Sequence, residues 1–177
     1  NFFFFYKKFS EVLQEAIDKG FTEPDPREDL NGNDVGRKLL ILARELDLQN
    51  EVEEIQIQNL IPEALREGSA TDFLNRLSEL DGIYQNIKDA QGPNEVLRYI
   101  GELSGDLQQD KGKLEVKLIS VPANSALGSL KGSDSIFEIY TESYGEQPIV
   151  IQGAGAGASV TARGVFGDIL RLSEKKL

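Results

Sequence analysis

The chain has 177 residues, of which 40% are hydrophobic and 28% are charged, the profile of a globular protein rather than a disordered one. A chain of this length buries roughly two thirds of its unfolded surface, which is enough for a substantial core. The net charge of -11 opposes binding to nucleic acid or to an anionic membrane, because both are bound through Lys and Arg. No apolar run reaches the roughly 18 residues of a membrane span, and no signal-peptide pattern is present, so we expect a cytoplasmic protein.

Two missing residue types restrict the chemistry that this chain can perform. It has no Cys and no His, which removes disulfides, thiol nucleophiles and the commonest metal ligand and general base. We therefore expect no metal site, and any catalysis has to be performed by Lys, Asp, Glu, Tyr or Ser. The chain also has no Met, which indicates either an internal fragment or a sequence from which modified residues are omitted.

Helical periodicity dominates the first half of the chain. Apolar residues recur every three or four positions over 9–17, and Gly20 ends this helix as a C-cap. Residues 22–33 are rich in Pro, Asp, Asn and Gly and predict a structured loop. A second helix begins at Asp34 with Asn33 as its N-cap, and its wide apolar face predicts that it is buried.

The second half changes to the two-residue period of strands. Residues 52–61 predict a first strand that stops at Pro62, and two further helices are predicted at 69–80 and 82–90. Turn residues then separate four good strands, and a final helix follows a Gly-rich turn; these strands are 96–101, 114–121, 135–141 and 148–152. Because no long helical crossovers join the strands, we expect an α+β fold with a mostly antiparallel or mixed sheet of about four to five strands and helices packed on one face.

Charged residues are densest between Thr22 and Lys38. Carboxylates crowded into a loop made rigid by proline repel one another unless a cation joins them, and a ligand ammonium would relieve that repulsion. The carboxylates concerned are Glu23, Asp25, Glu28, Asp29 and Asp34. Calcium is a weak alternative here, because the glycine of this loop comes too early for the EF-hand spacing.

Asp34 and Lys38 stand four residues apart, so they share one face of the predicted helix and lie within ion-pair reach. One interpretation is a surface salt bridge worth a few tenths of a kcal/mol. The other is a functional pair, in which Asp34 orients an ammonium that acts on a ligand. The pattern alone leaves both interpretations open.

Residues 152–161 form a Gly-rich turn between a predicted strand and a predicted helix. Glycine lets a backbone approach a ligand closely, but this segment lacks the full dinucleotide fingerprint, and tight packing of the helix on the strand is the favoured interpretation. Residues 126–134 are predicted to be a plain connection. The aromatic run 2–6 is predicted to be core or interface, since no basic groove accompanies it.

Residues 21–45, which begin Phe-Thr-Glu-Pro-Asp-Pro-Arg-Glu-Asp-Leu-Asn-Gly-Asn-Asp-Val-Gly-Arg-Lys, resemble the signature segment of homoserine dehydrogenases. The segments 130–134 and 152–162 resemble that family too, in the same order. The resemblance implies that residues 1–177 are a catalytic and dimerisation domain that lacks the N-terminal Rossmann domain. Some members of the family are fused to an aspartate kinase.

By resemblance, the activity is the NAD- or NADP-dependent interconversion of L-aspartate 4-semialdehyde and L-homoserine, on the route to threonine and methionine, by a homodimer. The isolated chain is then expected to be inactive. The resemblance implies that Lys38 is the acid/base and that Asp34 assists it, that Gly20, Glu23 and Asp29 bind the substrate, and that Gly157 binds the cofactor. The alternative is a non-catalytic dimerisation or regulatory module, because sheet faces with alternating apolar residues have to be buried.

Overall fold

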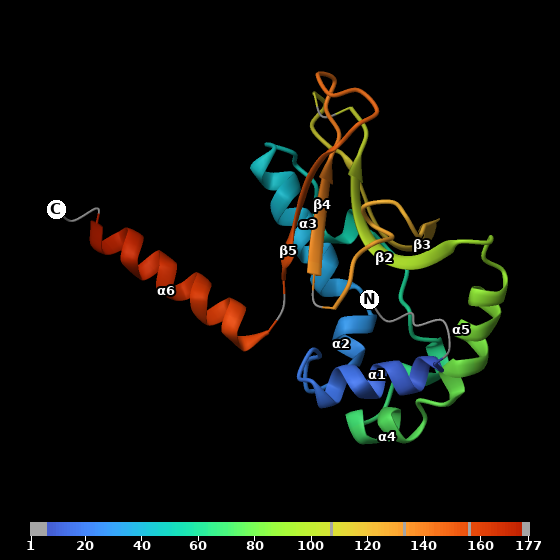
Figure 1. Cartoon of the computed structure of the whole chain (residues 1–177). Coiled ribbons are helices and arrows are strands. Elements are labelled where there is room, and N and C mark those ends of the chain that lie inside the picture. Colours follow the sequence, from blue (N-terminus) through green and yellow to red (C-terminus); the bar gives the residue numbers. More distant parts are fainter. Residues whose placement is uncertain (1–6, 107, 133, 156, 175–177) are drawn as a thin grey trace. The chain divides into compact units, whose positions relative to one another are not determined.

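The computed structural model describes residues 7–174 except 107, 133 and 156. They form two compact units that divide between Ala123 and Asn124 (Figure 1). In the described residues the first unit holds five α-helices and a three-stranded sheet, and the second holds a two-stranded sheet and one helix. The predicted α+β class is therefore confirmed. The aromatic run 2–6 lies outside the described residues.

Helix α1 (Phe9–Asp18) follows the predicted periodicity and ends where glycine allows it. Gly20 has a φ of +68°, and its N–H donates to the carbonyl of Ile17 at 2.9 Å. The N–H of Phe21 donates to the carbonyl of Ala16 at 2.9 Å. These bonds satisfy carbonyls left open at the helix end, so the predicted C-terminal stop is confirmed.

The predicted loop contains a one-turn helix, α2 (Arg27–Leu30), and leads into α3 (Asn33–Glu45). The prediction of Asn33 as N-cap is wrong: the N-cap is Gly32, whose left-handed φ of +79° turns the chain from one helix into the next. The predicted burial of α3 is also only partial. Leu39 is buried, whereas Ile41 is 60% exposed, because one face alone meets the sheet.

Two 3₁₀ turns, η1 (Val52–Glu54) and η2 (Glu63–Leu65), precede helices α4 (Ala70–Asn75) and α5 (Glu79–Asp89). The predicted boundary between residues 80 and 82 is wrong, since α5 runs straight through Gly82. The start of α4 is set by a capping box, in which the hydroxyl of Ser69 accepts the N–H of Asp72 at 3.1 Å.

The sheet of the first unit has the order β1-β3-β2, with strands β1 (Gln56–Ile57), β2 (Glu95–Ser104) and β3 (Lys113–Pro122). Strands β2 and β3 pair antiparallel along their full length, and the short β1 pairs parallel to β3. The strand predicted at 52–61 is thus only two residues long. Helix α3 packs on β2 and β3.

Two groups of buried apolar residues hold this unit together. The first joins α1, α2, α4 and α5, where the rings of Phe9 and Tyr84 stack with centroids 3.9 Å apart. The Tyr84 hydroxyl donates to the carbonyl of Leu60 at 2.7 Å, which ties this helical core to the segment after β1. The second group lies between α3 and the sheet and includes Leu39, Ala43 and Val116.

The second unit consists of the antiparallel pair β4 (Asp134–Ile139) and β5 (Ile149–Ala154) and the helix α6 (Ala158–Glu174). No residue of α6 is buried, and every residue of β5 is exposed. A two-stranded ribbon is marginally stable on its own. Within the part of the chain that the structure describes, no helix has both the length and the apolar character needed to cross a membrane.

Gly32 is the tightest point between α3 and the strands. The Tyr99 hydroxyl donates to the carbonyl of Gln58 at 2.7 Å and lies against Gly32. A Cβ at Gly32 would overlap that hydroxyl and come within 2.8 Å of Ile57 Cγ2. The absence of a side chain therefore allows the start of α3 to sit close to β1 and β2.

We predict that Gly32→Ala lowers the free energy of unfolding by about 2–5 kcal/mol, from the left-handed conformation and the overpacking together. Gly82→Ala is the matched control, because Gly82 lies in α5 with open space around it. Its alanine should raise stability by up to about 1 kcal/mol. Urea unfolding of both variants measures the difference. Equal effects would contradict this account of Gly32.

Candidate functional site

Five of the six predicted site residues lie at the end of α1, in the loop that contains α2, and at the start of α3. Within this loop Glu23 and Asp29 are joined directly, since the Glu23 N–H donates to Asp29 Oδ2 at 2.9 Å. The Glu23 side chain is exposed, whereas Asp29 is half-buried. The loop thus presents one carboxylate to solvent and holds a second against the protein.

The half-buried carboxylate of Asp29 is in an unfavourable environment. Burial raises its pKa above the ordinary value, and the negative charges of Glu23 and Asp34 raise it further. The N–H of Glu23 lowers the pKa and so offsets part of this effect. Asp29 is therefore a carboxylate that a neighbouring cation would stabilise.

Asp34 and Lys38 form the predicted ion pair, with Lys38 Nζ 2.7 Å from Asp34 Oδ2. Arg37 Nη2 lies 3.7 Å from the other oxygen of the same carboxylate. The side chain of Lys38 is 72% exposed, so its ammonium is oriented by Asp34 and open to a ligand from solvent. An exposed i,i+4 ion pair of this kind is by itself worth little to stability, because solvent screens both charges.

The two predicted site glycines have different settings. Gly20 has a φ of +68° in the turn after α1, which by itself explains the need for glycine. Gly157 has a φ of +111° and immediately precedes α6, in the second unit. Its carbonyl accepts the N–H groups of Val160 and Thr161 at 3.1 and 3.2 Å. In the first unit, contacts thus link Glu23 to Asp29 and Asp34 to Lys38, whereas Gly157 lies in the second unit.

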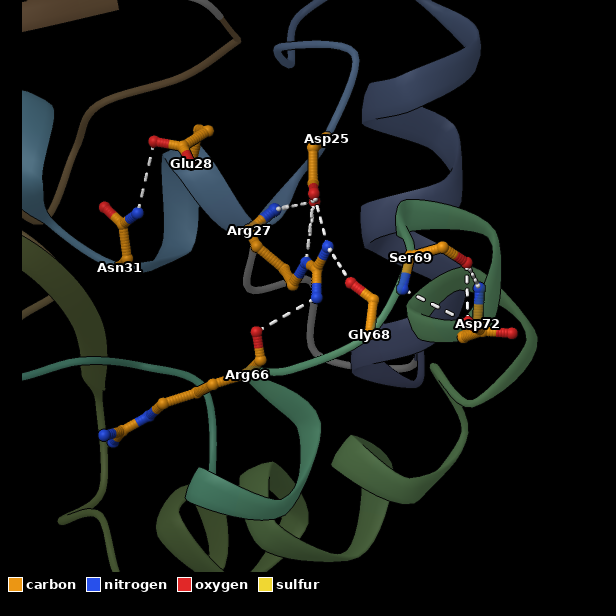
Figure 2. Close-up of polar contacts among 8 residues, drawn as sticks. All are labelled: Asp25, Arg27, Glu28, Asn31, Arg66, Gly68, Ser69 and Asp72. Carbon is orange, nitrogen blue, oxygen red and sulfur yellow. Dashed lines mark hydrogen bonds and ion pairs between the residues drawn. The ribbon is translucent and has the colours of Figure 1, made fainter.

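Sequence reasoning missed a clamp made by Arg27, which Figure 2 shows. Nε and Nη2 of Arg27 contact the Asp25 carboxylate, the shortest distance being 2.6 Å. Nη1 donates to the carbonyl of Arg66 and Nη2 to that of Gly68, each at 3.0 Å. The Arg27 guanidinium lowers the pKa of Asp25 below its ordinary value. The Asp-Pro-Arg sequence was a signal for the local pair, but nothing local pointed to the two carbonyls.

An open hollow of about 250 Å³ adjoins this clamp. Its lining is mostly polar and comes from the α2 loop, the start of α3 and the segment after β1; the residues are Asp25, Arg27, Glu28, Asn31, Asn33, Asn59, Ile61 and Arg66. In the residues that the structure describes, no cluster of three or more acids is placed to hold a metal ion.

Fold and site together define a class of protein. Its members have an α+β unit in which one helix begins with an ion pair, directly after a loop rich in acids. The family model for homoserine dehydrogenase matches residues 4–170. The chloroplastic bifunctional aspartokinase/homoserine dehydrogenase 1 of Arabidopsis thaliana is 44% identical over 169 residues, which are 94% of this chain and 18% of that protein. Homoserine dehydrogenase of Paracoccidioides brasiliensis is 43% identical over 96% of this chain and 45% of its own length.

Solved structures with a similar fold are also found. A Candida auris protein described as of unknown function superposes with a TM-score of 0.78 at 40% identity, covering 96% of this chain and 47% of its own. Homoserine dehydrogenase of Thermoplasma acidophilum superposes with a TM-score of 0.62 at 23% identity, which supports the fold. The chain belongs to the homoserine dehydrogenase family, and it spans less than half the length of each relative named here.

The environment of Asp29 predicts a stability that depends on pH. A carboxyl whose folded pKa is raised contributes stability below its unfolded pKa, and this contribution is lost as pH rises through the folded pKa. Asp29→Asn keeps an oxygen that accepts the Glu23 N–H and removes the charge. We therefore expect this variant to be more stable than the wild type at pH 7 and to lose that advantage as pH falls through the raised folded pKa of Asp29 towards the ordinary value of about 3.8.

Asp72→Asn is the control of opposite sign. The hydroxyl and N–H of Ser69 lower the Asp72 pKa, so this carboxylate stabilises the fold above its unfolded pKa and the variant should be less stable at pH 7. Urea unfolding of both variants between pH 3 and pH 7 measures the two trends. A destabilised Asp29→Asn at pH 7 would show that Asp29 is a structural group.

Proposed function

We propose that this chain supplies the substrate site and the acid/base group for the interconversion of L-aspartate 4-semialdehyde and L-homoserine with NAD or NADP. The observation that carries the proposal is the Asp34–Lys38 ion pair on the helix that begins directly after the loop holding Glu23 and Asp29. The family assignment supports it. The activity is assigned to the full-length protein, because this chain is only part of the length of its relatives.

Lys38 is suited to the proton transfer of this reaction. Reducing the aldehyde places a hydride on carbon and a proton on oxygen, and an ammonium can both polarise the carbonyl and deliver that proton. In the reverse direction the amine of Lys38 receives the proton of the homoserine hydroxyl. Asp34 Oδ2 lies 2.7 Å from the Lys38 ammonium and fixes its direction.

The acid pair is suited to the other end of the substrate. Both substrates carry an α-ammonium group, and Glu23 offers an exposed carboxylate while Asp29 offers one with a raised pKa. A bound ammonium would offset the repulsion that Glu23 and Asp34 exert on Asp29. Recognition at this end leaves the oxygen-bearing carbon free to meet Lys38.

NAD or NADP supplies the hydride acceptor or donor when it is bound. Gly157 fits such a group, because a Cβ at its φ of +111° is strained and the position has open space around it. The peptide at Gly157 can therefore approach a large ligand closely. The choice between NAD and NADP rests on residues outside the site described here.

Dimerisation is a second proposed role and is compatible with the first. Several large apolar side chains of the second unit are exposed, among them Phe137 and Ile151 on the β4–β5 ribbon. We propose that this apolar surface is covered in a homodimer, whether or not the chain also contributes to catalysis.

The compartment of this protein is a separate question. The plant relatives are chloroplastic by their names, and the cytoplasmic location stays a prediction.

We predict that Lys38→Ala in the full-length enzyme lowers kcat for homoserine oxidation by at least about 100-fold, the range of a lost general acid or base. The KM for NADP should stay within about 2-fold, since Lys38 acts on the substrate oxygen. Arg37→Ala is the control, because Arg37 contacts the same carboxylate at 3.7 Å and is similarly exposed. Arg37→Ala should keep kcat within about 3-fold. Near-normal turnover by Lys38→Ala would refute the proposed role.

We predict that Glu23→Gln raises the KM for homoserine by about 10-fold or more, the effect of losing a hydrogen bond between charged groups. Glu28→Gln is the matched control: Glu28 is an exposed neighbour whose carboxylate accepts the Asn31 amide at 3.3 Å. It should leave that KM within about 2-fold. Steady-state kinetics with homoserine as the varied substrate measures both, and equal KM values for the two variants would remove Glu23 from the substrate site.

A further inference from the structure

Arg27 is among the most constrained charged side chains of the first unit. Only 13% of its side chain is exposed, and its guanidinium lies over the ring of Phe73, 5.6 Å from the centroid. Phe73 itself is 2% exposed and belongs to the core between the helices. This contact fixes the guanidinium on its face. The bonds to Asp25, Arg66 and Gly68 fix it on its edges (Figure 2).

The clamp joins segments that are far apart in sequence. Arg66 and Gly68 follow η2, 39 and 41 residues after Arg27. On the other side, Arg27 is the first residue of α2, and Asp29 lies in the same helical turn. The clamp thereby fixes α2 on the helical core. The carboxylate of Asp29, which accepts the Glu23 N–H, lies in this same turn.

This loop needs to be held from outside. A helix of four residues has no stability of its own in water, because nucleation is unfavourable. The charges of Glu23 and Asp34 also act against Asp29, so repulsion favours a more open loop. The carboxylate of Asp25 is paired with the Arg27 guanidinium at 2.6 Å. Its negative charge is therefore balanced and does not add to the repulsion on Asp29.

We propose that Arg27, with Asp25, is a positioning residue that sets Glu23 and Asp29 for the substrate ammonium. This inference rests on the proposed function and deepens it. Arg27 is assigned no role in the chemical step, because Nε, Nη1 and Nη2 each already donate to Asp25 or to a backbone carbonyl. Its removal should therefore weaken substrate binding and leave the proton transfer at Lys38 nearly unchanged.

The test is the kinetics of Arg27→Lys in the full-length enzyme, with homoserine and NADP. Lysine keeps the charge and loses the planar fork that serves three partners at once. We expect the KM for homoserine to rise about 10-fold or more while kcat stays within about 3-fold, the signature of lost ground-state binding. The KM for NADP should stay within about 2-fold.

Arg76→Lys is the matched control for a purely structural role. Arg76 also contacts a carboxylate through two nitrogens, at 2.7 and 2.9 Å from Glu79, and donates to the carbonyl of Ala64 at 3.2 Å. Loss of either clamp can lower the melting temperature, but an unfolded fraction reduces apparent kcat and leaves KM unchanged. Arg76→Lys should thus keep the KM for homoserine of the wild type.

Asp25→Asn serves as a second variant should Arg27→Lys fail to fold. It keeps the bonds of Arg27 to both carbonyls, and it should raise the KM for homoserine about 2- to 5-fold, since only the charged partner is weakened. An unchanged KM in the folded variants overturns the inference. Lys38→Ala, measured alongside, separates this inference from the proposed function. If Lys38→Ala loses turnover while Arg27→Lys and Asp25→Asn keep the wild-type KM for homoserine, the inference is wrong and the proposed function stands. A wild type without homoserine turnover overturns both.

Discussion

The partial burial of one carboxylate, Asp29, in a short acidic loop is the constraint on which the candidate site depends. Burial raises the pKa of Asp29, and the neighbouring acids raise it further, so contacts on the opposite side of the loop have to offset this cost. Leu30, the next residue, is 2% exposed in the helical core, and its carbonyl accepts the Leu60 N–H at 3.0 Å. One turn of helix thus has a buried apolar face and an acidic face, and the burial of Leu30 offsets the electrostatic strain on Asp29.

Helix α3 begins directly after this loop and carries Lys38. Its inner face packs on the sheet through Leu39 and Ala43, and its outer face carries Asp34 and Lys38 one turn apart. Gly32 allows the first turn to lie directly against Tyr99, whose hydroxyl is fixed on the Gln58 carbonyl. A rigid support of this kind is what a group needs when it has to meet a substrate atom repeatedly in one geometry.

Sequence reasoning succeeded where structure is local and failed where it depends on distant partners. The period of apolar residues predicted α1, α3 and the strands β2 to β5, because side-chain periodicity reflects one local conformation. The residue type alone placed the N-cap of α3 at Asn33, although the sharp turn there requires the left-handed conformation of Gly32. It also missed the Arg27 clamp, whose carbonyl partners are about 40 residues away. The crowding of acids in this loop could be read from the sequence because its members are neighbours in the chain, and their role stays a prediction.

The exposure of Lys38 bears on what a complete active site requires. Because 72% of the Lys38 side chain is exposed, water screens its charge, which then acts weakly on a carbonyl. Under the proposed function, the surface that brings the hydride to the substrate has to cover Lys38 as well. Covering it removes water and so strengthens the interaction of its ammonium with Asp34 and with the substrate. The ion pair that is a surface contact in this chain then becomes the electrostatic centre of the reaction.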